Sequence, residues 1–406
     1  MSDAGAFNSA TANSLVVMAG GAFAVPLLSR KIKLPASVGE ILFGVLVGHE
    51  VLNLVHSGEF VHLTAELGFF LLMFIAGLEL DFRRLEAGGI KPLLQGLGVT
   101  LSVFILAFLG ATFLGLEPFA GLVGGAISIG IPLVLLQETG LGKTPFGQNI
   151  MLVGSIGEFA SILLVTAVAA YDHSHGLNFS FVLELLELGA LFIAAYFILA
   201  VLRTAVWWRS KSFSRVVESH DPSEIGVRAG LFLMFCFVAA AAKFEIDPIL
   251  GAFLAGALFS FVFRGKGPLE LKFMSMGNGF FVPFFFISVG LNFSIAKAKD
   301  GDVVLLLKLL LLMACARVLA FLLVPGGKDK SVLSSVGSGL LLSAPLTLLV
   351  VVANLGLRLG SIDETTHATV ILLAVLSSTI YPFLFKMLVP AILATQPKSD
   401  DPGHGH

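Results

Sequence analysis

Long apolar runs separated by short polar stretches make up most of this chain. A run of roughly 17 to 25 apolar residues is long enough to cross the hydrocarbon core of a bilayer as a helix. Thirteen runs are candidates, with approximate limits 12–29, 35–55, 62–80, 91–115, 118–137, 146–170, 179–202, 224–243, 247–263, 273–296, 303–324, 331–356 and 365–395. The pattern predicts an all-α integral membrane protein with about 13 transmembrane helices.

The composition supports a membrane protein. Hydrophobic residues make up 56% of the chain and charged residues 13%, whereas soluble domains carry about 25% charged residues. The formal net charge of -2 gives no reason to expect a nucleic-acid partner. No cofactor is expected, because the phosphate-loop pattern that ends at Gly142-Lys143-Thr144 has Gln137 where its first glycine would stand. The histidines of loops such as 171–175 are interpreted as solvated, with no metal site expected.

Basic residues predict the orientation, because cytoplasmic loops carry an excess of Lys and Arg. The loops after odd-numbered runs, together with the C-terminal end, hold eighteen basic residues, and the loops after even-numbered runs hold four. This distribution predicts an external N-terminus and a cytoplasmic C-terminus. No Lys or Arg occurs in the first dozen residues, so a cleavable signal peptide is not expected.

Glu158 is a carboxylate inside the sixth apolar run, and Lys308 is an amine inside the eleventh. Charged groups at bilayer depth are costly and mark ion pathways. Arg317 lies nine residues after Lys308, which is about 13.5 Å along a helix and on its opposite side. Lysine, unlike arginine, can lose its proton when desolvated. We therefore expect Lys308 to pair with Glu158, and Arg317 to neutralise carbonyls of a broken helix.

Two apolar runs carry helix breakers in comparable places. Small residues precede Ser128 and Pro132 in the fifth run, and the twelfth run contains Pro345 followed by Thr347. A proline removes one backbone donor and frees a carbonyl one turn earlier, and such broken helices are typical of transporter binding sites. We interpret the two halves of the chain as inverted copies joined by the seventh run. The alternative is that both prolines kink ordinary helices.

The chain resembles the bacterial monovalent cation:proton antiporters, in the branch that includes glutathione-gated potassium efflux transporters and sodium/proton exchangers. The resemblance covers nearly the whole chain. It rests on the order of several motifs and on the spacing of Lys308 and Arg317; the motifs are 34–44, 66–68, 74–81, 251–256 and 284–290.

This resemblance implies a homodimeric secondary transporter of the bacterial inner membrane, not an enzyme, with two crossed discontinuous helices. A core domain, about 91–170 and 303–395, would move in an elevator-like way against a dimerisation domain, about 12–80 and 224–296. Residues 179–202 would form a linker helix. The membrane domain would cover 1–396, and 397–406 would be a short cytoplasmic tail.

In that family an acidic residue on the sixth span binds a cation and a proton alternately, and Glu158 occupies its place. Ser128 and Thr347 on the broken helices are expected to join it in the binding site. The chain departs from the family at Gly157, where an acidic or amide residue is common, and at Ile127, where a threonine is usual. A single carboxylate cycles one proton, so electroneutral exchange of K⁺ or Na⁺ for H⁺ is expected.

Two other functions stay open from the sequence. The chain could be a sensor or channel-like membrane subunit on an antiporter scaffold, working with a separate cytoplasmic regulatory subunit. It could also transport an anion, if Lys308 and Arg317 both face the cavity and Glu158 is neutral.

Overall fold

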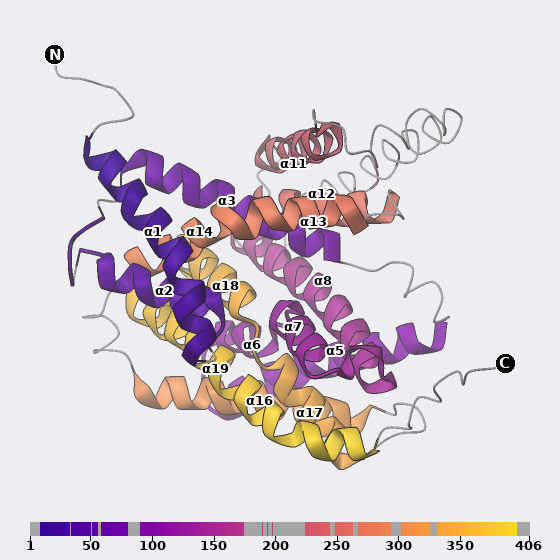
Figure 1. Cartoon of the computed structure of the whole chain (residues 1–406). Helices are drawn as coiled ribbons and strands as arrows, with labels where there is room; N and C mark the ends of the chain where they lie inside the picture. The colour runs from indigo at the N-terminus through magenta and orange to yellow at the C-terminus, as the bar shows by residue number, and fades with distance from the viewer. Residues whose placement is uncertain are drawn as a thin grey trace, which may run out of the picture. The chain divides into compact units, whose positions relative to one another are not determined.

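A computed structural model shows a chain built of helices (Figure 1). No strand occurs among the residues that the structure describes. These residues are 9–32, 34–49, 51–55, 58–79, 90–173, 189, 193, 197, 224–243, 248–262, 267–293, 302–324 and 331–395.

The chain divides into two compact units, and each is assembled from separate stretches of sequence. The first unit comprises 1–87, 162–301 and 355–368, and the second comprises 88–161, 302–354 and 369–406. The assignment of a transport core, a dimerisation domain and a linker helix to particular residues stays a prediction.

The first unit contains α1 (Ser9–Ile32), α2 (Ala36–Val47), α3 (Glu59–Glu79), α11 (Ile225–Lys243), α12 (Pro248–Val262), α13 (Gly267–Met276), the π-helical turn η2 (Gly277–Phe281) and α14 (Val282–Leu291). Glycines allow α3 and α12 to approach closely. A Cβ atom at Gly77 would collide with the Phe253 carbonyl, and one at Gly256 would collide with the Phe74 carbonyl. The two backbones therefore touch, as is common between membrane helices that carry small residues at their interface.

The second unit contains α5 (Ile90–Phe113), α6 (Pro118–Gly125), α7 (Gly130–Glu138), the short 3-10 helix η1 (Leu141–Lys143), α8 (Pro145–His173), α16 (Val303–Leu323), α17 (Val332–Leu342), α18 (Leu346–Arg358) and α19 (Glu364–Thr395). The helices α8, α18 and α19 each have one end in the first unit. In the second unit α16 packs against α5, α6 and α17.

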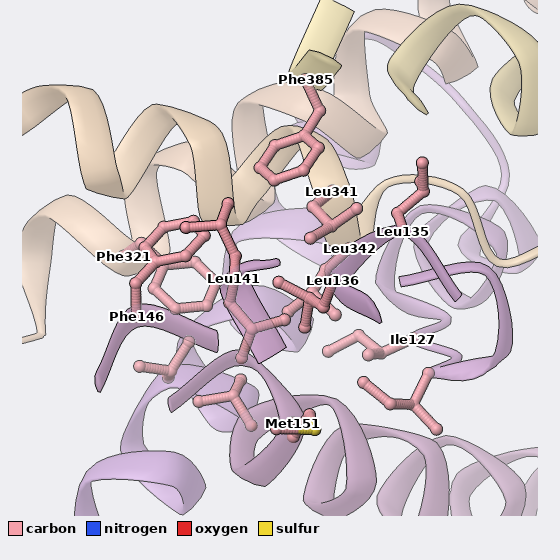
Figure 2. Close-up of a cluster of buried hydrophobic side chains, with 14 of the residues drawn as sticks. Ile127, Leu135, Leu136, Leu141, Phe146, Met151, Phe321, Leu341, Leu342 and Phe385 are labelled. Atoms are coloured by element: carbon pink, nitrogen blue, oxygen red, sulfur yellow. The ribbon is translucent and has the colours of Figure 1, made fainter. Parts of the chain in front are cut away.

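The hydrophobic core of the second unit joins residues from several of these elements (Figure 2). Phe146 and Met151 come from α8, Leu341 from α17, Phe385 from α19, and Ile127 from the segment between α6 and α7. Ile127 is completely buried. Since burial of a side chain of this size contributes about 1.5–3 kcal/mol, this core fixes the segment that follows α6.

The predicted all-helical membrane fold is confirmed. Among the described residues, nine helices are long and apolar enough to cross a membrane, or ten if the bent pair α17 and α18 counts as one span. Two shorter apolar helices, Ala36–Val47 and Pro248–Phe261, fall in the second and ninth predicted runs. Twelve of the thirteen predicted runs hold one of these helices or the bent pair. The seventh run, 179–202, lies outside the described residues apart from three positions.

Both runs with predicted breakers are interrupted. Residues 126–129 are not helical and separate α6 from α7, and α17 and α18 meet at an angle of 49°. Pro132 is the third residue of α7, and Pro345 directly precedes α18. Proline fits at the start of a helix, where its missing N–H has no intrahelical partner to lose. The inverted repeats, the crossing of the two broken helices and the dimer stay predictions.

Candidate functional site

The Glu158 carboxylate on α8 meets the non-helical segment 126–129. Glu158 is only 4% exposed. The Ser128 hydroxyl donates a hydrogen bond of 2.8 Å to Glu158 Oε1, and the Ile129 backbone N–H donates one of 3.4 Å to Oε2. Each carboxylate oxygen therefore has one donor from the same short segment.

The start of α7 also contributes charge to this site. The first N–H groups of a helix have no intrahelical partner, and the N-terminal end carries roughly half a positive charge. Ile129 directly precedes α7, and its N–H is aimed at Glu158. In the described part of the chain, no lysine, arginine or histidine forms an ion pair with Glu158. The carboxylate is held by dipoles, which leaves it able to receive a cation.

Ile127 is tied to α8 on both sides of Glu158. Its N–H donates a hydrogen bond of 3.0 Å to Ser161 Oγ, and that hydroxyl donates one of 2.6 Å to the Gly157 carbonyl. A Cβ atom at Gly157 would lie 2.7 Å from Ile127 Cγ2. The two departures from the family pattern, Ile127 and Gly157, therefore fit each other sterically.

Arg317 on α16 is completely buried at the other end of the unwound segment. Its Nη1 donates to the carbonyls of Gly124 at 2.8 Å and Met313 at 2.9 Å, and its Nη2 donates to the carbonyl of Ala126. Gly124 and Ala126 lie at the C-terminal end of α6, where carbonyls lack intrahelical partners and carry partial negative charge. The guanidinium supplies the charge and the donors that this buried helix end requires.

Lys308 does not form the expected ion pair with Glu158. It is half-buried, and its Nζ donates a hydrogen bond of 3.0 Å to the carbonyl of Leu114, just after α5 ends. Lys308 and Arg317 point from opposite sides of α16, and the side that carries Arg317 faces the unwound segment. Lys308 therefore reaches the end of α5 instead, where a cation complements the helix dipole.

Lys308→Met is accordingly expected to be a mild change. It removes one hydrogen bond and a favourable helix-end charge, so we expect a loss of about 1 kcal/mol in stability. Cation-dependent proton flux should stay close to the native rate, because Lys308 Nζ bonds the Leu114 carbonyl and not Glu158. Flux in proteoliposomes and the melting temperature in detergent measure both quantities. Complete loss of flux in a folded Lys308→Met protein would restore the ion-pair interpretation.

The second broken helix has its own buried hydroxyl. Ser343 Oγ donates to the Gly339 carbonyl at 2.7 Å and lies 3.4 Å from the Met313 carbonyl. Thr347, in the first turn of α18, is half-buried. No hydrogen bond connects Thr347 with Ser128 or Glu158 in the described structure. Of the three predicted binding residues, the structure brings Ser128 and Glu158 together.

Sequence analysis overlooked two buried hydroxyl groups. Ser161 follows Glu158 by three residues, so both lie on one side of α8, and this spacing was a usable signal. Tyr381 Oη on α19 donates a hydrogen bond of 2.5 Å to the Leu310 carbonyl on α16. A tyrosine in an apolar run commonly finds such a partner, but the sequence does not identify which one.

Comparison with known proteins identifies the family. Residues 19–390 match the model of the family described as "Sodium/hydrogen exchanger, transmembrane". The Putative Na(+)/H(+) antiporter YjbQ of Bacillus subtilis is 30% identical over 397 residues, covering 92% of this chain and 62% of that protein. The Na(+)/H(+)-K(+) antiporter GerN of Bacillus cereus is 24% identical over 365 residues, covering 88% of this chain and 91% of that protein.

The fold has a counterpart among solved structures. The sodium proton antiporter MjNhaP1 of Methanocaldococcus jannaschii, at pH 8, superimposes with a TM-score of 0.64 and 13% identity, covering 95% of this chain and 98% of that one. The chain spans less than two thirds of the Bacillus subtilis relative. The match to the family model nevertheless extends over nearly all of the chain. The chain belongs to the transmembrane sodium/hydrogen exchanger family, whose members are secondary transporters and not enzymes.

Proposed function

We propose that this protein exchanges a monovalent cation, Na⁺ or K⁺, for protons by alternating access, with Glu158 binding the two ions in turn. The observation that carries the proposal is a buried carboxylate whose partners are a hydroxyl and a backbone N–H. Family membership and the names of the relatives, which are Na⁺/H⁺ and Na⁺/H⁺-K⁺ antiporters, support the same exchange.

Competition between the two ions follows from the chemistry of this carboxylate. An ionised group at membrane depth is costly unless an opposite charge joins it. A proton or a monovalent cation can supply that charge, but both require the same two oxygens. The Ser128 hydroxyl donates to Glu158 in the structure, and its oxygen also has lone pairs that can accept a cation. Carbonyls of an unwound segment are further ligands that transporters use.

Electroneutral exchange follows from the same site. Gly157 and Phe159 flank Glu158, so neither of its neighbours in the sequence is ionisable. One carboxylate releases one proton for each cation that it binds, and the net charge moved is then zero. The exchange rate should not respond to the membrane potential.

An elevator-like movement is supported by the position of the site within one unit. Ser128, Glu158 and Arg317 all belong to the second unit. A unit that contains the complete set can carry its ion as it moves. We propose that the first unit forms a homodimer, that the N-terminus is external, and that the protein resides in the bacterial inner membrane. These proposals come from the family resemblance and the distribution of basic residues.

Anion transport is less well supported than cation exchange. It would need the cationic groups of Lys308 and Arg317 to face a cavity. The Nη atoms of Arg317 donate hydrogen bonds to backbone carbonyls, and Lys308 Nζ donates one to the Leu114 carbonyl. These donors are therefore directed at backbone carbonyls instead of at a ligand.

Proteoliposomes that contain a pH-sensitive dye test the proposed function. Na⁺, K⁺ and Li⁺ are added in turn to the native protein, and at least one is expected to drive proton movement. For the response to Na⁺ or Li⁺, valinomycin with equal potassium on both sides then clamps the potential near zero, and an electroneutral exchange should keep its rate. Acceleration by valinomycin would contradict electroneutrality. A folded protein without any cation response would overturn the antiporter proposal.

A further inference from the structure

Ser161 connects α8 to the unwound segment through a single oxygen atom. The hydroxyl oxygen accepts a hydrogen bond from the Ile127 N–H, and the hydroxyl O–H donates one to the Gly157 carbonyl. Ser161 is only 1% exposed. The bond to Gly157 is the ordinary one that a serine makes to the carbonyl four residues earlier in a helix. The bond to Ile127 is different, because it reaches a residue 34 positions earlier in the chain.

The Ile127 N–H needs this partner. The Ala126 N–H still donates to the Leu122 carbonyl at 3.0 Å. Ile127 is the first residue whose N–H lies beyond this last helical bond, so it lacks the carbonyl that helical bonding would supply. Buried backbone donors are almost always paired, since an unpaired one is costly. Arg317 holds the Ala126 carbonyl, and Glu158 accepts from Ser128 and Ile129. Ser161 binds Ile127, which lies between Ala126 on the Arg317 side and Ser128 on the Glu158 side.

The fit of side chains strengthens this connection. A Cβ atom at Gly157 would lie 2.7, 2.8 and 2.9 Å from three atoms of Ile127. The turn of α8 from Gly157 to Ser161 therefore contacts Ile127 at both ends. Gly157 packs against the Ile127 side chain, and Ser161 accepts the hydrogen bond of the Ile127 N–H. Glu158 lies within that turn. Any shift of Ile127 along α8 would move Ser128, the next residue, relative to the carboxylate.

We propose that Ser161 is a positioning residue for the ion site: it fixes Ile127 so that Ser128 Oγ and the Ile129 N–H both reach Glu158. Ser161 itself forms no hydrogen bond with either carboxylate oxygen in the described structure. Ser161 thereby affects how strongly the Glu158 carboxylate binds a cation relative to a proton, because it fixes the positions of the two donors to that carboxylate. This inference rests on the proposed exchange at Glu158.

Ser161→Ala is the central variant, and Thr166→Val is its matched control. Thr166 is also buried on α8 and also bonds the carbonyl four residues earlier, at 2.9 Å to Ile162, but it has no bond to the unwound segment. Ser161→Thr retains a hydroxyl and should restore function, whereas Ser161→Cys fills the space with a weak hydrogen-bonding group. Together the four variants separate the bond to Ile127 from packing and from the general effect of losing a helix hydroxyl.

The measurement is the cation activation curve of proton flux, recorded at several pH values. In Ser161→Ala the cation concentration for half-maximal flux should rise about tenfold, as expected for the loss of one buried hydrogen bond. The pH of half-maximal activity should rise as well, because Glu158 loses donors that favour its charged form. Maximal flux at saturating cation should stay within about threefold of native. Ser161→Cys should resemble Ser161→Ala, and Thr166→Val should resemble the native protein.

A second measurement does not depend on transport. A cation that binds the native state raises its melting temperature, so detergent-solubilised protein is melted with and without Na⁺ or K⁺. The cation-induced rise should shrink in Ser161→Ala and persist in Thr166→Val. If Ser161→Ala does not fold, Ser161→Cys takes its place. The positioning role would be overturned if Ser161→Ala and Ser161→Cys kept the native cation activation curve and pH profile. It would also be overturned if Thr166→Val changed both as much as Ser161→Ala does. Full activity in Glu158→Gln would instead overturn the proposed function itself.

Discussion

Glu158→Gln is expected to abolish cation-driven proton flux, to the level of empty liposomes. The amide has nearly the same shape, and its carbonyl oxygen can still accept the Ser128 hydrogen bond. It carries no charge to attract a cation, and it cannot bind and release a proton at accessible pH. If Glu158 is the group for which the two ions compete, removing its ionisation removes both halves of the exchange. The loss should be complete at every pH.

The control for this variant is another carboxylate in the same unit. Glu138, the last residue of α7, forms an exposed ion pair of 3.0 Å with Lys386 on α19. Exposed pairs contribute about 0–1 kcal/mol, so Glu138→Gln should keep flux and stability close to native. Glu158→Asp keeps the ionisable group on a shorter side chain, and we expect weaker but measurable exchange. Native flux in a folded Glu158→Gln protein would exclude Glu158 as the shared binding group.

The structure shows which kinds of inference a membrane sequence permits. The apolar runs predicted the helices because each span must satisfy its own backbone in lipid. Glu158 was selected as a site residue because a charge at bilayer depth is costly. Ser128 was selected because Pro132 and the glycines before it indicated an interruption, and the structure places its hydroxyl against Glu158. These features have local causes, and a single stretch of sequence contains them.

The partners of the charged residues were harder to predict. The spacing of Lys308 and Arg317 placed them on opposite sides of one helix, but it did not indicate which side faces the unwound segment. The structure brings Arg317 to that segment and Lys308 to the end of α5. Ser161 was missed for a related reason, since its bond to Ile127 joins residues that only the tertiary fold brings together.

The unwound segment 126–129 connects Glu158 with Arg317, and neither residue forms an ion pair with the other in the described structure. Arg317 donates hydrogen bonds to the carbonyls of Gly124, in α6, and Ala126, the first residue of the segment. Ser128 and Ile129, at the other end of the segment, donate to Glu158. The partial negative charge of α6 is thereby neutralised by a fixed cation, and the partial positive charge of α7 is directed at the ion-binding carboxylate. Arg317 therefore supports Glu158 indirectly, through the segment that both residues contact.

Arg317→Met should therefore destabilise the second unit and stop transport. The change leaves the carbonyls of Gly124 and Ala126 buried without their donors. Each unsatisfied buried group costs about 1–3 kcal/mol, so we expect a loss of about 2–6 kcal/mol for the two carbonyls. Arg317→Lys retains the charge, but a lysine ammonium lacks the planar fork that spans two carbonyls. The expected order of stability and flux is native, then Arg317→Lys, then Arg317→Met.

Melting temperatures in detergent and proton flux in liposomes measure this order. The matched control is Arg228→Met, since Arg228 also lies in a candidate membrane span, on α11, but is exposed. If losing an arginine from a span were harmful in general, both Met variants would suffer. If Arg317 acts by holding the end of α6, only Arg317→Met should melt early and lose flux. A native melting temperature and native flux in Arg317→Met would show that the broken helix keeps its geometry without this guanidinium.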